Sequence, residues 1–124
     1  MEEIIITKEY LDTHPKEIFV FGDNITRVGT GGAAALRGCI NTYGFITKKR
    51  PDHRDDSYFR PLEYRQVFYD ELDKLIETIE DNPEYTYLIS KVGGGLANKY
   101  NIFEEVIRDG LEALRPYKNV RFLF

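Results

Sequence analysis

Short apolar runs alternate along the chain with longer amphipathic segments. The runs are rich in β-branched and aromatic residues, which is typical of buried strands. The expected strands are Ile4–Thr7, Glu17–Gly22, Tyr43–Thr47, Tyr85–Ser90 and Asn119–Phe124. Because strands alternate with helical segments, the pattern predicts one α/β domain over residues 1–124, with three layers (α/β/α) and a mixed sheet.

The segments between these strands carry helical signals. Lys8–His14 is expected to form a helical turn that ends at Pro15, and Gly31–Gly38 a short helix. A long helix is expected from Pro61, because proline suits the first turn, to Asn82. Its apolar stripe is Val67, Phe68, Leu72, Leu75, Ile76 and Ile79.

A last helix is expected between Asn101 and Pro116. Asn101 precedes Glu104 by three residues, which is the spacing of a helix N-cap. Gly110 indicates close contact between this helix and the sheet. The apolar face of the helix is Phe103, Val106, Ile107, Leu111 and Leu114.

The segment Lys48–Arg60 is polar, and we expect it to be a long exposed loop, of the kind that often covers a functional site. It contains a basic strip of Lys48, Lys49, Arg50 and Arg54. Such a strip is most often a solvated loop, and its functional interpretation is a positive rim for a phosphorylated ligand.

Composition limits the choices of function. The 124 residues are 42% hydrophobic and 31% charged, with a formal net charge of −4. This excludes a strongly basic field, so no extended nucleic acid is expected as a partner. The single cysteine, Cys39, is expected to be packed inside the domain rather than to act as a nucleophile, and it favours a reducing, cytoplasmic compartment.

Membranes and metals are not expected partners. The apolar run Ile4–Ile6 is too short for a signal peptide, and no segment approaches the ~20 apolar residues that span a bilayer. His53 with Asp52, Asp55 and Asp56 has no recognised metal-ligand spacing, so neither a metal nor a cofactor is predicted.

Two glycine-rich turns, each after an expected strand, are the main functional signal. The first runs from Gly22-Asp23-Asn24 to Gly31-Gly32-Ala33-Ala34, and the second is Gly93-Gly94-Gly95-Leu96. Glycines allow a backbone to approach a ligand closely, and ligands of open α/β sheets bind beyond the carboxyl ends of strands. The two loops therefore predict one cleft with N–H groups suited to phosphate.

The first turn has two interpretations. Asp23 and Asn24 are typical of residues that close a turn through their own side chains. In the functional interpretation, Asn24 contacts a ribose hydroxyl, and Asp23 accepts from another hydroxyl or orients a water. Gly31 and Gly32 would open a helix whose N-terminus is partly positive. The spacing matches neither a phosphate-binding P-loop nor a dinucleotide fingerprint.

The second turn is the stronger signal, because a strand end rarely needs three glycines merely to turn. Its N–H groups would form an anion nest, with Gly94 at positive φ and close to phosphate. Lys91 would neutralise a phosphate or face solvent. Asn98-Lys99-Tyr100 would close over the ligand, with Tyr100 stacking on a ring.

These motifs carry two resemblances. Most of the chain resembles an uncharacterised domain family of bacteria and their phages. The segments that match are Phe19–Asn24, Gly31–Leu36, Tyr43–Lys49, Leu88–Lys99 and Asn119–Leu123. The same layout is similar to macro domains, which bind ADP-ribose and its derivatives.

The macro-domain resemblance implies roles for the glycine loops. Asn24 would meet the distal ribose. The loops would hold the ribose and its phosphates through Gly31, Gly32, Ala33, Gly93, Gly94, Gly95 and Leu96. The turn Gly22-Asp23-Asn24 departs from the Ala-Ala-Asn form of that family, and Asp12 is a poor match for the aspartate that reads adenine.

The leading hypothesis is a module that binds ADP-ribose or a related nucleotide. An ADP-ribosyl or ribose-phosphate hydrolase is the main alternative, with Asp23 as the candidate base. Two further alternatives are sequestration of a nucleotide immune signal, as in bacteria and phages, and an interaction domain without a small ligand. The sequence leaves open a homo-oligomer.

Overall fold

The computed structural model describes residues 3–124. Its centre is a four-stranded sheet in the order β2-β1-β3-β4. The strands are β1 (Glu17–Asn24), β2 (Thr42–Lys48), β3 (Thr86–Ile89) and β4 (Val120–Phe122). The α/β class is confirmed, but the expected mixed sheet is wrong: within the described residues, every pair of neighbouring strands is parallel. Each connection carries a helix across one face of the sheet, so the chain re-enters in the same direction.

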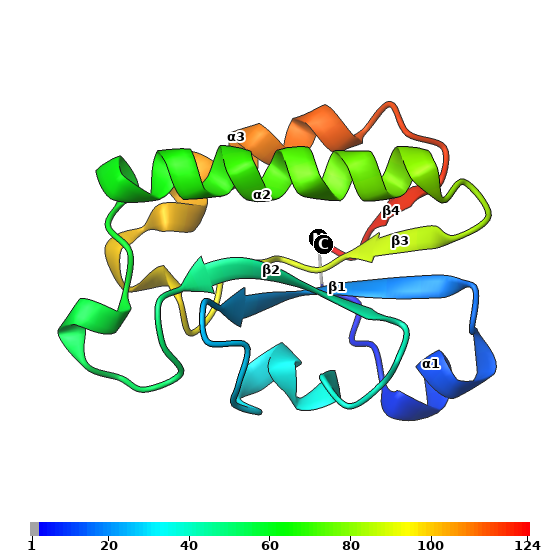
Figure 1. The fold of residues 1–124 in the computed structure, drawn as a ribbon, viewed down its shortest axis with the longest axis horizontal. Helices are drawn as coiled ribbons and strands as arrows, with labels where there is room; N and C mark the ends of the chain where they lie inside the picture. Colours follow the sequence, from blue (N-terminus) through cyan, green and yellow to red (C-terminus); the bar gives the residue numbers. More distant parts are fainter. Residues whose placement is uncertain (1–2) are drawn as a thin grey trace.

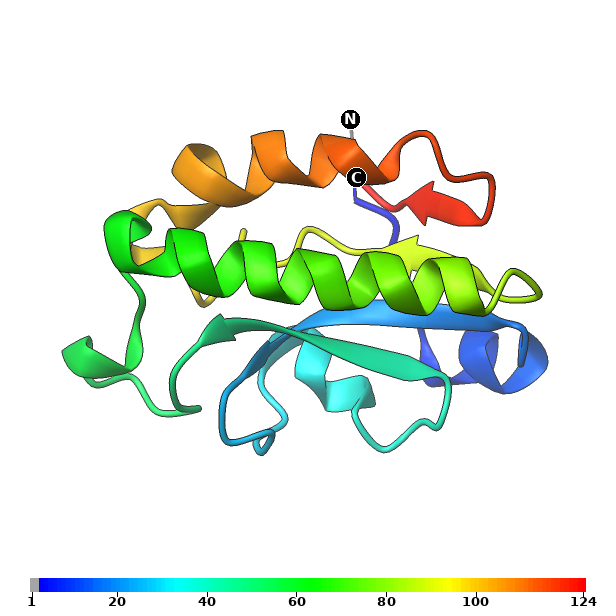
Figure 2. The same ribbon diagram turned by 45° about the horizontal axis from the view of Figure 1, so that its top comes forward.

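Helices cover both faces of the sheet. The long helix α2 (Pro61–Asp81) and the last helical segment lie on one face, and α1 (Lys8–Thr13) and the 3₁₀ helix η1 (Gly32–Leu36) lie on the other (Figures 1 and 2). The last segment is irregular, and two short 3₁₀ turns occur in loops. These remaining elements are η2 (Asp55–Ser57), η3 (Asn98–Tyr100), the π-turn η4 (Phe103–Ile107), α3 (Arg108–Gly110) and η5 (Leu111–Leu114).

Successive side chains of β1 point to opposite faces of the sheet, and the core therefore consists of two clusters. Val20 faces α2 and joins the larger cluster, whereas Phe19 and Phe21 face α1 and η1 in the smaller one. Phe68, Leu72, Leu75 and Ile79 of the predicted α2 stripe are buried, as is the whole predicted face of the last helix; Val67 and Ile76 are partly buried. Gly110 does make a close contact, but with Phe68 of α2 rather than with the sheet.

Two expectations near the helix and strand ends are wrong. Ile4–Thr7 forms no strand; the Ile4 N–H donates to the Leu123 carbonyl at 2.7 Å, just beyond the end of β4, and Ile6 is buried in the smaller cluster. Asn101 does not cap the last helix with its side chain. It adopts a left-handed φ of 62°, and the Asn98 side chain instead accepts from the Phe103 N–H at 3.0 Å.

The segment Lys48–Arg60 is only partly the exposed loop that was expected. Lys48 ends β2 and is buried, and Ser57, Tyr58 and Phe59 return to the core. Lys48 and Tyr58 form an antiparallel bridge that closes the loop. Within the described part of the chain, no helix has the length and apolar character needed to cross a bilayer.

Candidate functional site

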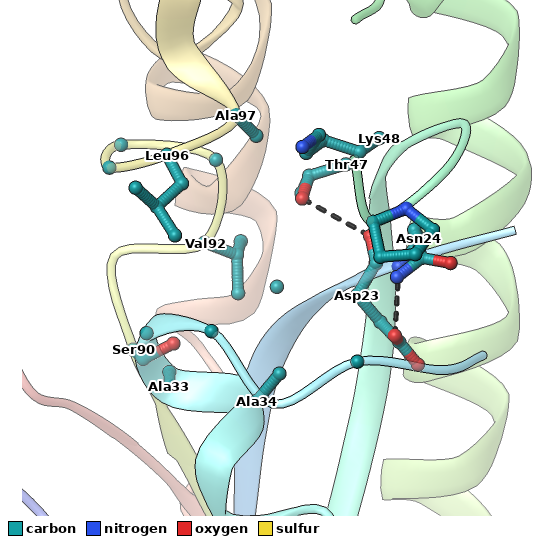
Figure 3. A pocket seen from close by; sticks show the side chains of 18 of the residues that line it. Asp23, Asn24, Ala33, Ala34, Thr47, Lys48, Ser90, Val92, Leu96 and Ala97 are labelled. Carbon is teal, nitrogen blue, oxygen red and sulfur yellow. Dashed lines mark hydrogen bonds between the residues drawn. The ribbon is translucent and has the colours of Figure 1, made fainter. Parts of the chain in front are cut away.

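A pocket lies where the strand order changes direction. From β1 the chain moves to β2 on one side, then crosses to β3 on the other, so the crevice beyond the carboxyl ends of β1 and β3 stays open. A pocket of about 500 Å³ occupies this crevice (Figure 3). That volume is in the usual range for small-molecule sites, roughly 300–1,000 Å³.

Both glycine-rich loops line this pocket. Gly31, Gly32 and Ala33 form one wall, and the segment from Lys91 to Ala97 forms the facing wall. The loops approach each other through Leu96, whose Cδ1 lies 3.5 Å from the position that a Cβ would take at Gly31. Two strand-end segments that are far apart in sequence therefore share one cavity, because parallel strands end at the same edge.

The two loops have many backbone donors without acceptors. Within residues 3–124, the backbone N–H groups of Gly31, Gly32 and Ala33 in the first loop make no hydrogen bond. The same holds in the facing segment for Lys91, Gly93, Gly95, Leu96 and Ala97. Unpaired N–H groups on successive residues are the ordinary means by which loops bind anions. The helix dipole expected for the first loop contributes little, because η1 is a five-residue 3₁₀ helix.

Asp23 lines the pocket, but its carboxylate is bound by arginines. The side chain is 2% exposed, and Arg37 donates to both oxygens, at 2.7 Å to Oδ1 and 3.0 Å to Oδ2. The Asn24 N–H and Arg27 Nη1 also donate to it, at 2.8 and 3.2 Å. Burial by itself would raise the pKa of Asp23, but the hydrogen bonds from Arg37, the Asn24 backbone and Arg27 together lower the pKa. The carboxylate is therefore a stable anion and a weak base.

The Asn24 side chain closes its own turn. Its Nδ2 donates to the Val28 carbonyl at 2.7 Å, and its Oδ1 accepts from both the N–H and the hydroxyl of Thr26. Of the two interpretations of this residue, the structure favours the turn. Asn24 shapes the loop from which the pocket wall is built, and its amide oxygen is already occupied by two donors.

The three glycines of the second loop differ in what they do. Gly93 has a φ of +75°, and a Cβ there would lie 2.3 Å from Ile107 Cδ1, so the fold itself requires this glycine. The expectation of a positive φ at Gly94 is wrong: its Cβ position faces only the flexible Lys91 stem, at 2.7 Å. Gly95 faces open space, and its missing side chain leaves room in the pocket.

Three residues expected to close over the ligand lie outside the pocket. Asn98 caps the last helical segment, and also donates to Glu104 at 2.9 Å. Lys99 and the Tyr100 hydroxyl both bind Asp55, so these side chains tie the second loop to the 48–60 loop. Lys91 does line the pocket, with its amino group 4.9 Å from the centre of the Phe103 ring.

Lys48, the first residue of the predicted basic strip, is the member of that strip that lines the pocket. It is buried, lines the pocket, and extends from the end of β2 toward the loop that carries Ala97 (Figure 3). Its Nζ donates to the Asp52 carbonyl at 2.7 Å and lies 4.5 Å from the centre of the Tyr58 ring. Burial lowers the pKa of its amine, and the attraction of the Asp52 carboxylate offsets this in part.

Sequence reasoning missed two contributors to the site. Arg37 follows Asp23 by 14 residues, and no spacing rule links an arginine just after a short helix to a carboxylate on a strand. His53 lines the pocket from the 48–60 loop, with its Nδ1 3.2 Å from the Tyr58 hydroxyl. The signal that could have found His53 is its place in the long polar loop, since such loops often cover functional sites. In residues 3–124, no three metal-ligating side chains gather in one place.

Fold and site together define a parallel α/β domain with a ligand-sized pocket at the change of strand order. Residues 1–99 match the model of the Family of unknown function (DUF7831), and the chain belongs to that family. The matched segment includes every residue that lines the pocket. No curated protein and no solved structure matches the chain.

Proposed function

We propose that this pocket binds ADP-ribose or a related nucleotide, with the ligand phosphates held by the two glycine-rich loops. The observation that carries the proposal is the set of unpaired backbone N–H groups that both loops contribute to one pocket. Such groups are favourable to phosphate, and their position beyond β1 and β3 is where parallel sheets bind nucleotides.

The remainder of the lining suits the sugar and base of such a ligand. Val28 and Leu96 line the pocket with side chains that are 53% and 60% exposed. These two apolar side chains lie on the two glycine-rich walls, and a bound ring system would cover them. Aliphatic contacts of this kind replace the aromatic stacking that was expected of Tyr100. The resemblance of the two loops to those of macro domains is the reason that the proposal names ADP-ribose.

Binding is favoured over hydrolysis. A general base needs a free oxygen and a pKa near the working pH. Asp23 has neither, because Arg37 donates to both of its oxygens and because the pKa of Asp23 is lowered. We therefore expect the ligand to be retained unchanged, in a reducing and cytoplasmic setting that suits a chain with a single cysteine.

Calorimetry with ADP-ribose, NAD and ADP tests the proposal. Gly95→Val adds a branched side chain in the pocket, where the fold has space for it, and we expect its affinity for the ligand to fall by about tenfold or more. Gly38→Val is the matched control, because Gly38 also faces open space and lies outside the pocket.

Two results would contradict the proposal. One is a wild-type protein that binds none of the three nucleotides. The other is a folded Gly95→Val variant with the affinity of the wild type. Chromatography of the ligand after long incubation then separates binding from hydrolysis, since a binding module returns the ligand intact.

A further inference from the structure

Lys48 lacks the partner that a buried amine normally has. Within residues 3–124 it is the only buried lysine, and no carboxylate oxygen lies within 4.0 Å of its Nζ. By contrast, Lys49 and Lys99 are more exposed and each pairs with a carboxylate, at 3.1 and 3.0 Å. Buried charges are usually paired, because an unpaired charge away from water is costly.

The contacts that Lys48 does make account for only part of its donor capacity. An ammonium group has three N–H donors, and one is used by the Asp52 carbonyl. The Tyr58 ring gives a further, weaker attraction at 4.5 Å. Two donors remain on a side chain that lines the pocket. A structural role for the stem is compatible with these contacts, but it does not require a charge at its end.

The charges around the pocket reinforce this argument. Asp23, the buried carboxylate in the lining, is already neutralised by Arg37 and Arg27. The Asp52 carboxylate is engaged by the Ser57 hydroxyl and by the Arg54 N–H. The lining also includes the exposed Glu3 and the partly buried Lys91. Lys48 is therefore the buried positive charge of the lining that lacks a paired carboxylate, and an anion from outside the protein would balance it.

We propose that Lys48 is the anion-recognition residue of this pocket and pairs with a phosphate of the bound ligand. This inference rests on the proposed function, and it narrows the ligand to one that presents a phosphate to the β2 end of the pocket. A charge-assisted hydrogen bond in a buried site is strong, so removal of the amine is expected to weaken binding by about tenfold or more.

The experiment compares Lys48→Met with Lys49→Met. Both variants remove one positive charge and keep a long stem. Lys49 is the adjacent lysine, but it lies outside the pocket and pairs with Glu63. Calorimetry measures the binding of ADP-ribose and of inorganic pyrophosphate to each protein, and Lys48→Arg tests whether a charge alone restores binding. Urea unfolding of each free protein separates a role in binding from a role in folding.

We expect Lys48→Met to lose affinity for both probes, with a free energy of unfolding no lower than that of the wild type, and Lys49→Met to bind as the wild type does. If the wild type binds ADP-ribose and Lys48→Met binds it equally well, the role of Lys48 is overturned and the proposed function stands. If pyrophosphate binding depends on Lys48 but ADP-ribose does not bind, the proposed function fails and the role of Lys48 stands. A wild type that binds neither probe overturns both.

Discussion

Arg37 holds the most deeply buried charge of the candidate site, so its removal should have a large and pH-dependent effect. Its guanidinium donates to both oxygens of Asp23, and its Nε donates to the Gly29 carbonyl at 3.0 Å. The Arg37→Met variant keeps much of the stem. It removes the guanidinium, whose Cζ lies 5.4 Å from the centre of the Phe21 ring, and leaves Arg27 as the remaining cation at Asp23. Asp23 is 2% exposed, and water therefore does not replace the lost partner.

The expected cost follows from this geometry. Removing one partner of a fully buried ion pair costs about 3–5 kcal/mol. Arg37 is itself 23% exposed, and Arg27 and the Asn24 N–H remain, so we expect about 2–3 kcal/mol. Arg27→Met is the matched control. The Arg27 side chain is 50% exposed and donates once to Asp23, at 3.2 Å, and once to the Gly44 carbonyl, at 2.8 Å, so we expect its loss to cost less than about 1 kcal/mol.

The pH dependence gives a second signature. In the wild type the pKa of Asp23 is lowered relative to the unfolded chain, so its contribution to stability is present above the unfolded pKa and is lost as the pH falls through the folded pKa. In Arg37→Met, burial without this partner should raise the pKa of Asp23. On acidification the variant then protonates Asp23 first, and the difference in stability from the wild type becomes smaller.

Urea unfolding followed by circular dichroism at pH 7 and at about pH 4 measures both effects. The reasoning is refuted if the difference between Arg37→Met and the wild type is the same at the two pH values. It is also refuted if Arg27→Met costs as much as Arg37→Met, because the bidentate contact would then have no special weight.

Two further predictions concern the backbone around the pocket and at the sheet edge. Gly93→Ala should cost about 2–4 kcal/mol of unfolding free energy, because its Cβ would lie 2.3 Å from Ile107 at a φ of +75°. The free energy of unfolding of Gly95→Ala should stay within about 0.5 kcal/mol of the wild-type value, and urea unfolding measures both variants. Glu71→Leu should cost about 1–3 kcal/mol and speed hydrogen exchange at the Ile46 amide, because the buried Glu71 Oε1 accepts from that N–H at 2.8 Å. Glu71→Gln keeps an acceptor and should restore protection, and slow exchange in Glu71→Leu would contradict this role.

Local patterns in the sequence determined most of the secondary structure. The predicted helix from Pro61 to Asn82 is α2, and its apolar spacing identified the residues that face the sheet. Four of the five expected strand runs are strands, since burial of a strand demands a continuous run of apolar residues, whereas Ile4–Thr7 is not one. Tyr64 and Glu71 were missed on α2. Each carries a polar group that β2 satisfies, through the Ile46 carbonyl for the Tyr64 hydroxyl and the Ile46 N–H for Glu71.

The sequence also predicted that the two glycine-rich loops share a pocket, because each follows an expected strand. The parallel direction of β1 and β3, which brings both strand ends to one edge, came from the tertiary structure. Only the tertiary structure decided which side chains are free in that site. The partners of Asp23 and the burial of Lys48 depend on contacts between segments that periodicity does not relate. Tertiary packing also decided which of three adjacent glycines the fold requires, because Ile107, 14 residues away, occupies the space next to Gly93.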